Sequence, residues 1–115
     1  MIKLYPELNR KLLEISEGDE EFKFELAKAI HNGLIELKSI YSKGYQEKDD
    51  VIIQQIRHKV KPTLAMFEFE DLIVEIQKGK EILEREGFSE NFSSHVSDLD
   101  RLVEIAIYNV DLLLK

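Results

Sequence analysis

Apolar residues recur at alternating intervals of three and four along most of the chain, and this spacing constrains the fold more than any other feature. Such intervals place apolar side chains on one face of a helix, whereas a half-buried strand needs an interval of two. No segment alternates at an interval of two, and only two prolines are present to interrupt helices. The pattern therefore predicts an all-α protein.

Glycines and capping residues divide this pattern into helices. Gly18, Gly44 and Gly87 each follow an apolar run, where a residue in the left-handed region commonly ends a helix. A side chain that can cap the next helix follows each glycine: Asp19, then Asp49 or Asp50, then Ser89. The helices expected from this division cover about residues 6–16, 19–43, 50–67, 70–86 and 89–114.

The connections between these helices are short, so consecutive helices are expected to be antiparallel. Alternating intervals of three and four are also what left-handed helix packing requires. We therefore expect an antiparallel up-down-up-down four-helix bundle with a short additional N-terminal helix, in a single domain of 115 residues. The core-facing stripe of the second helix is expected to contain Phe22, Leu26, Ile30, Gly33, Leu37 and Ile40.

The charge and composition exclude several function classes. A formal net charge of −7 without a basic stripe disfavours nucleic acid and anionic membranes as partners. The absence of cysteine excludes disulfides, a thiol nucleophile and a zinc site built on thiolates. The first residues lack the long apolar core of a signal peptide, and no run is long enough to span a bilayer. We expect a cytoplasmic protein whose partners are other proteins.

The three histidines are the candidate reactive residues. His95 lies at the edge of the apolar stripe of the last helix, where we expect a boundary position with a structural hydrogen bond. His31 lies across its helix from the apolar stripe and is expected at the surface. His58 differs, because at about 100° per residue it points about 180° away from the apolar side of the third helix. Its imidazole is therefore expected to project into water.

The outward face around His58 is short of carboxylates in a chain that is rich in them. Its other members are Val51, Gln54, Lys61, Pro62 and Ala65. Small and apolar side chains around one lysine and a central histidine favour a flat docking surface over a solvated face. On spacing alone, however, an ordinary exposed histidine near a lysine is the better explanation.

One stretch of the third helix resembles the signature of histidine phosphotransfer (HPt) domains: Gln55-Ile56-Arg57-His58-Lys59-Val60-Lys61-Pro62-Thr63. That signature has an active histidine, a lysine three residues later and then a small residue, usually glycine. Upstream, a leucine-rich turn followed by Gly18-Asp19 and Phe22 resembles the opening of the family's second helix. The acidic loop at Lys48-Asp49-Asp50 is also similar. The likeness runs from about residue 8 to residue 86 and includes the helix order.

Two positions depart from the family pattern. Pro62 replaces the usual glycine after Lys61, and Glu68 stands where a second glycine often closes the motif. Proline has no N–H to bond the carbonyl four residues earlier, which here belongs to His58. We therefore expect a kink at the histidine, with that carbonyl left for water.

The resemblance implies a phosphorelay carrier with no independent turnover. A ring nitrogen of His58, Nε2 in the family, would accept a phosphoryl group from a receiver-domain aspartate and pass it to another receiver. Lys61 would neutralise phosphoryl charge. The implied receiver docking face consists of Val51, Gln54, Arg57, Lys59, Pro62 and Ala65, with Arg57 and Lys59 steering an acidic partner.

The implied partners are response-regulator receiver domains and a hybrid sensor kinase. The chain itself would be a monomer with a single HPt domain that spans residues 1–115. No cofactor or metal is expected on this chain, because Mg²⁺ would be held by the receiver. Two other function classes compete. A non-phosphorylated adaptor or dimerisation module would use the same exposed face. A helical enzyme or metal protein would need inward-facing histidine and carboxylate side chains that converge, and the pattern predicts none.

Overall fold

The computed structural model describes residues 5–114, and in this range it consists of helices with no strand. The helices are α1 (Pro6–Ser16), α2 (Glu20–Glu47), α3 (Asp50–Met66), α4 (Glu70–Glu86) and α5 (Glu90–Leu114). The all-α class is therefore confirmed, and four of the five helices agree with their expected bounds to within one residue. Residues 1–4, on which the signal-peptide expectation partly depends, lie outside the described part of the chain.

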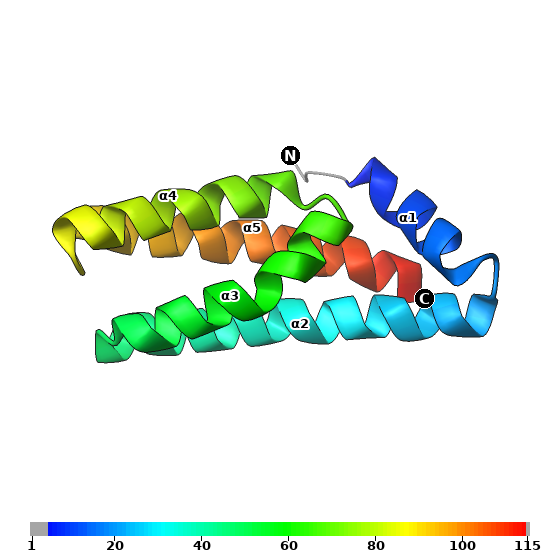
Figure 1. Ribbon diagram of the computed structural model, residues 1–115, viewed down its shortest axis with the longest axis horizontal. Helices are drawn as coiled ribbons and strands as arrows, with labels where there is room; N and C mark the ends of the chain where they lie inside the picture. Colours follow the sequence, from blue (N-terminus) through cyan, green and yellow to red (C-terminus); the bar gives the residue numbers. More distant parts are fainter. Residues whose placement is uncertain (1–4, 115) are drawn as a thin grey trace.

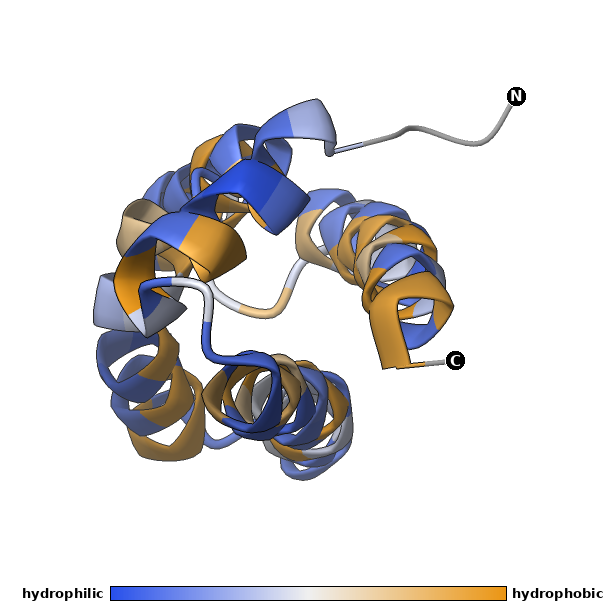
Figure 2. Cartoon of the chain, turned by 90° about the vertical axis from the view of Figure 1, so that its right-hand side faces the viewer, coloured by the Kyte–Doolittle hydropathy of each residue, from blue (hydrophilic) through white to orange (hydrophobic). Residues whose placement is uncertain are grey.

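The four long helices run along the longest dimension of the molecule, and α1 crosses near one end (Figure 1). α2 packs against α3 and α5, and α4 packs against the same two helices, while α1 packs on α2. An end-on view shows these helices around a common centre, each with hydrophobic and hydrophilic residues (Figure 2). None of the described helices is long and apolar enough to cross a membrane.

Side-chain caps mark the beginning of three helices, α2, α3 and α5. The carboxylate of Asp19 accepts a hydrogen bond from the backbone N–H of Phe22 at 3.0 Å, and that of Asp49 accepts one from Val51 at 3.0 Å. Ser89 caps α5 in the same way. Each bond satisfies a backbone donor that has no partner within its helix. The three caps expected from the sequence are thus confirmed, with Asp49 chosen over its neighbour.

Gly44 does not end the second helix, so that expectation is wrong. α2 continues to Glu47, and Lys48 then adopts a left-handed φ of 51°. Gly44 is buried, and a Cβ at this position would lie 2.8 Å from the Ile53 side chain. The glycine therefore leaves room for the Ile53 side chain where α2 and α3 meet, and a larger residue would force that side chain to move.

The buried stripe of α2 is displaced from the expected one. Phe22 is 47% exposed, and Leu26, Gly33 and Ile40 are only half-buried. The residues of α2 that are buried are Ala27, Ile30, Leu34, Leu37, Tyr41 and Gly44. Both sets follow intervals of three and four, so periodicity alone identifies an apolar side without locating its centre. The positions of α3 and α5 decide which set is buried.

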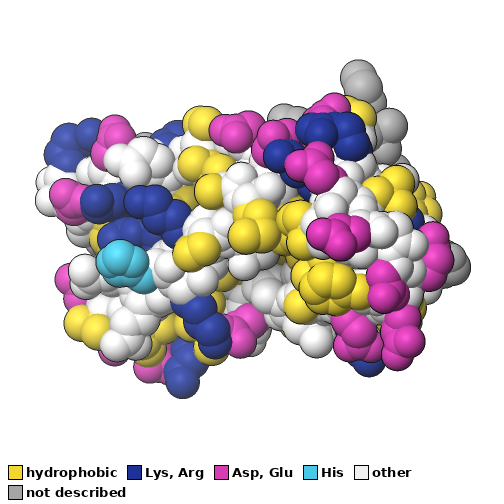
Figure 3. Space-filling view, turned by 45° about the vertical axis from the view of Figure 1, so that its right-hand side comes forward, with side chains coloured by type: hydrophobic (Ala, Val, Ile, Leu, Met, Phe, Trp, Pro, Cys, Tyr) yellow, Lys and Arg dark blue, Asp and Glu magenta, His cyan; other side chains and the backbone are white. Residues whose placement is uncertain are grey.

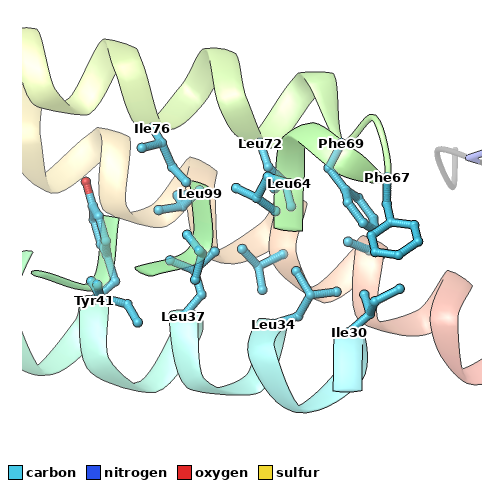
Figure 4. Close-up of a cluster of buried hydrophobic side chains, with 14 of the residues drawn as sticks. Ile30, Leu34, Leu37, Tyr41, Leu64, Phe67, Phe69, Leu72, Ile76 and Leu99 are labelled. Atoms are coloured by element: carbon cyan, nitrogen blue, oxygen red, sulfur yellow. The ribbon is translucent and has the colours of Figure 1, made fainter. Parts of the chain in front are cut away.

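The predicted core of α3 is confirmed, since all five of its expected residues are buried: Ile53, Ile56, Val60, Leu64 and Phe67. All five belong to the core cluster, and Figure 4 shows one part of it, in which Leu34 and Leu37 of α2 lie opposite Leu64, Leu72 and Leu99. This core holds α3 in one rotation about its axis. It therefore also determines which side of α3 faces solvent.

His95 lies in the core and not at its boundary, which corrects the expected position. The hydroxyl of Tyr41 is 2.7 Å from Nε2 of His95, and Nδ1 is 2.6 Å from Oε2 of Glu75. A neutral ring satisfies both contacts by accepting from Tyr41 and donating to Glu75. Burial lowers the pKa of His95, although Glu75 opposes that shift. Gly79 leaves room for the ring, because a Cβ there would overlap it.

The pairing of His95 with Glu75 also corrects the expectation that no inward-facing histidine and carboxylate converge. Within residues 5–114, however, no group of three or more His, Asp or Glu side chains could hold a metal ion. His31 is 27% exposed, and its Nε2 lies 3.0 Å from Oδ1 of Asp111. The ring is thus only partly exposed, and it pairs with Asp111 of α5, so the expected surface position holds only in part.

Candidate functional site

His58 lies in the middle of α3 with its side chain exposed to solvent. Its position follows from the core contacts of the same helix, because Ile56 and Val60 are both buried. A residue two positions from each of them points to the opposite side of the helix. The expected outward orientation of the imidazole therefore agrees with the structure.

The other residues singled out on α3 are all at least partly accessible. Arg57 is half-buried, and the following are exposed: Val51, Gln54, Lys59, Lys61, Pro62 and Ala65. Lys59 differs from the rest because its Nζ lies 2.6 Å from Oε1 of Glu36 on α2. It points toward the α2 side of α3, so the structure does not bring it together with Arg57 as a steering pair.

The surface beside His58 is hollowed and not flat, which corrects the expected shape. A groove of about 300 Å³ lies between α3 and α4. Nine residues line it: Gln54, Arg57, His58, Lys61 and Leu64 from α3, and Ile73, Ile76, Gln77 and Lys80 from α4. Leu64 and Ile76 are buried and form an apolar floor. The groove arises because α3 meets α4 near their connection and diverges from it elsewhere (Figure 1).

The groove carries positive charge in an acidic protein. Among residues 5–114, Arg57, Lys61 and Lys80 line it, and no Asp or Glu does. Among the described residues, neither Arg57 nor Lys61 has an ion-pair partner within 4.0 Å. Figure 3 shows a face of the molecule on which a histidine adjoins a group of Lys and Arg side chains. Unpaired cations around a concave surface attract an anionic group.

The residues contributed by α4 were not found from the sequence. Lys80 lies four positions after Ile76 and three after Gln77, so it shares a side of the helix with each of them. The periodicity of α4 indicates that Ile76 belongs to the apolar side. It contains no signal that this edge of the apolar side adjoins His58, which is a property of the packing of α4 against α3.

Pro62 lies inside α3 and is exposed. α3 changes direction along its length, as expected for a helix that contains a proline (Figure 1). Glu68, the second departure from the HPt pattern, has a φ of 59°. This left-handed conformation favours glycine. Glu68 therefore holds a backbone conformation that glycine would adopt at lower steric cost.

Comparisons with models of known protein families, with curated proteins and with solved structures find no match to this chain. A functional interpretation must therefore start from the chemistry of His58 and the groove beside it.

Proposed function

We propose that this chain is a histidine phosphotransfer domain that carries a phosphoryl group on His58. In the same proposal, α2–α5 form an antiparallel up-down-up-down bundle and α1 is an additional N-terminal helix. The observation that carries the proposal is an exposed imidazole at the edge of a groove that has three cations and no carboxylate. This combination suits a nucleophile that must hold a dianionic group after reaction.

The proposed reaction is an in-line displacement at phosphorus. A neutral imidazole nitrogen of His58 attacks the phosphorus of an aspartyl phosphate on a receiver domain, forming an N–P bond. The P–O bond to the aspartate breaks, and its electron pair remains on the carboxylate. The imidazole proton passes to water, and the reverse sequence delivers the phosphoryl group to a second receiver.

The roles of the neighbouring residues follow from their positions. The ammonium group of Lys61, three residues after His58 and therefore on the same side of α3, neutralises phosphoryl charge. Arg57 attracts the acidic pocket of a receiver, and Gln54 and Ala65 form the edge of the docking face. The receiver contributes Mg²⁺, so the chain itself needs no cofactor. We propose that it acts in the cytoplasm as a monomeric carrier.

The test is transfer of label from a purified receiver domain phosphorylated in the presence of Mg²⁺. The wild-type protein should acquire an acid-labile, base-stable phosphate, and His58→Gln should acquire none while keeping its melting temperature. His31→Gln is the matched control, because it removes another partly exposed histidine on a different helix. Label on His58→Gln would refute the site. A wild-type protein that binds phosphorylated receivers without accepting label would instead be a non-phosphorylated adaptor.

A further inference from the structure

Lys80 is the one cation that α4 contributes to the groove. It lies one turn after Ile76, whose side chain is buried, so the two share a side of the helix. The Lys80 side chain is 44% exposed. A half-exposed lysine beside an apolar floor places its methylene stem along that floor and its ammonium group at the surface.

Within residues 5–114, the ammonium group of Lys80 makes only one long ion pair. Its ammonium lies 4.0 Å from Oε1 of Glu84, which is 67% exposed and on the same helix. Such a pair between exposed side chains contributes little to stability. Lys59, by contrast, lies 2.6 Å from its carboxylate partner across a helix interface. Lys80 can therefore turn toward an anion in the groove at small cost.

We infer that Lys80 completes the phosphoryl-binding site, so that phosphohistidine 58 is held by ammonium groups from two helices, Lys61 on α3 and Lys80 on α4. This inference rests on the proposed function. A phosphoryl group carries nearly two negative charges and three acceptor oxygens, which a single lysine does not satisfy. The apolar floor of Leu64 and Ile76 excludes water beneath the group and thereby strengthens both interactions.

The experiment measures the phosphoryl group directly by ³¹P NMR. Phosphoramidate phosphorylates the imidazole without a receiver: the donor's P–N bond breaks, ammonia leaves with the imidazole proton, and a new N–P bond forms. The phosphoryl pKa is then followed in wild type, in Lys80→Gln and in Lys78→Gln. Lys78 is the matched control, because it is an exposed lysine of α4 that does not line the groove.

Lys80→Gln should raise the phosphoryl pKa by roughly 0.5 unit, because a nearby ammonium favours the dianion. It should also slow transfer from a phosphorylated receiver roughly fivefold, which corresponds to about 1 kcal/mol of lost transition-state stabilisation. Lys78→Gln should leave the pKa unchanged and the rate within about twofold of wild type. A Lys80→Gln protein that matches Lys78→Gln in phosphoryl pKa would overturn the inference.

The inference and the proposed function fail in different ways. If a receiver labels His58 but Lys80→Gln has no effect, only the role of Lys80 is wrong. If phosphoramidate labels His58 with the expected dependence on Lys80 and no receiver does, the phosphorelay is wrong and the anion site stands. If neither donor labels His58, both are overturned.

Discussion

Replacing Gly79 with alanine tests the packing around the buried histidine. A Cβ on Gly79 would come within 2.7 Å of Cδ2 of His95 and closer still to Nε2 and Cε1. The ring would have to move by about 1 Å or more to restore van der Waals contact. That displacement would break its bonds of 2.7 Å to Tyr41 and 2.6 Å to Glu75.

The expected cost follows from these contacts. Each buried polar group left without a partner costs about 1–3 kcal/mol, and overpacking costs about 1–3 kcal/mol more. Alanine returns about 1 kcal/mol because it is the better helix former. We expect Gly79→Ala to lower the free energy of unfolding by about 3 kcal/mol, a large part of the ~5–15 kcal/mol typical of a domain.

Gly33→Ala is the matched control. Gly33 is also inside a helix, but a Cβ there meets nothing within 4 Å. The same substitution should therefore raise the free energy of unfolding by about 0.5–1 kcal/mol. The same substitution is thus expected to lower the free energy of unfolding at Gly79 and to raise it at Gly33.

Urea denaturation measures both variants, with the midpoint reporting stability as long as the slope is unchanged. A double-mutant cycle with His95→Ala isolates the contact, since Gly79→Ala should cost at least about 2 kcal/mol less once the ring is absent. A Gly79→Ala protein within about 1 kcal/mol of wild type, or the same cost without the ring, would refute this account of the core.

Two further predictions concern the backbone and pH. Lys48→Gly should stabilise the protein by about 1 kcal/mol, because Lys48 has a left-handed φ. Lys43→Gly, inside α2, should destabilise it by about as much. If urea denaturation showed that both substitutions change the free energy of unfolding in the same direction, this account would be contradicted. Burial lowers the pKa of His95 in the folded state, so the unfolded state binds the proton more readily. The stability linked to His95 is therefore present above about pH 6.5 and decreases as the pH falls below it, by at most about 1.4 kcal/mol per pH unit. A histidine resonance of His95 that titrates at or above pH 6.5 in NMR would disprove the shift.

The local features of this protein follow from its sequence, because they depend on neighbours along the chain. The caps at Asp19, Asp49 and Ser89 determine where three helices begin. The outward position of His58 follows from the apolar side of its own helix, which contains Ile56 and Val60. Each of these inferences involves residues within about one turn of each other, and helical geometry relates such residues without knowledge of the fold.

Features that depend on two helices could not be obtained in that way. Glycine commonly ends helices, yet Gly44 lies inside α2, where the absence of a side chain leaves room for Ile53. The spacing within α5 predicts a boundary position for His95, but its ring is buried against Glu75 and Gly79 of α4. In each case the partner lies on another helix, and the spacing within one helix contains no information about that partner.

The sequence by itself determined that the chain is helical, where its helices begin, and that His58 and Lys61 share the exposed side of α3. Only the tertiary structure decided that this side borders a groove and that Lys80 of α4 lies across it. The physical reason is that helical periodicity defines the rotation of a helix about its own axis, whereas the distance and angle between helices depend on the side chains that meet between them.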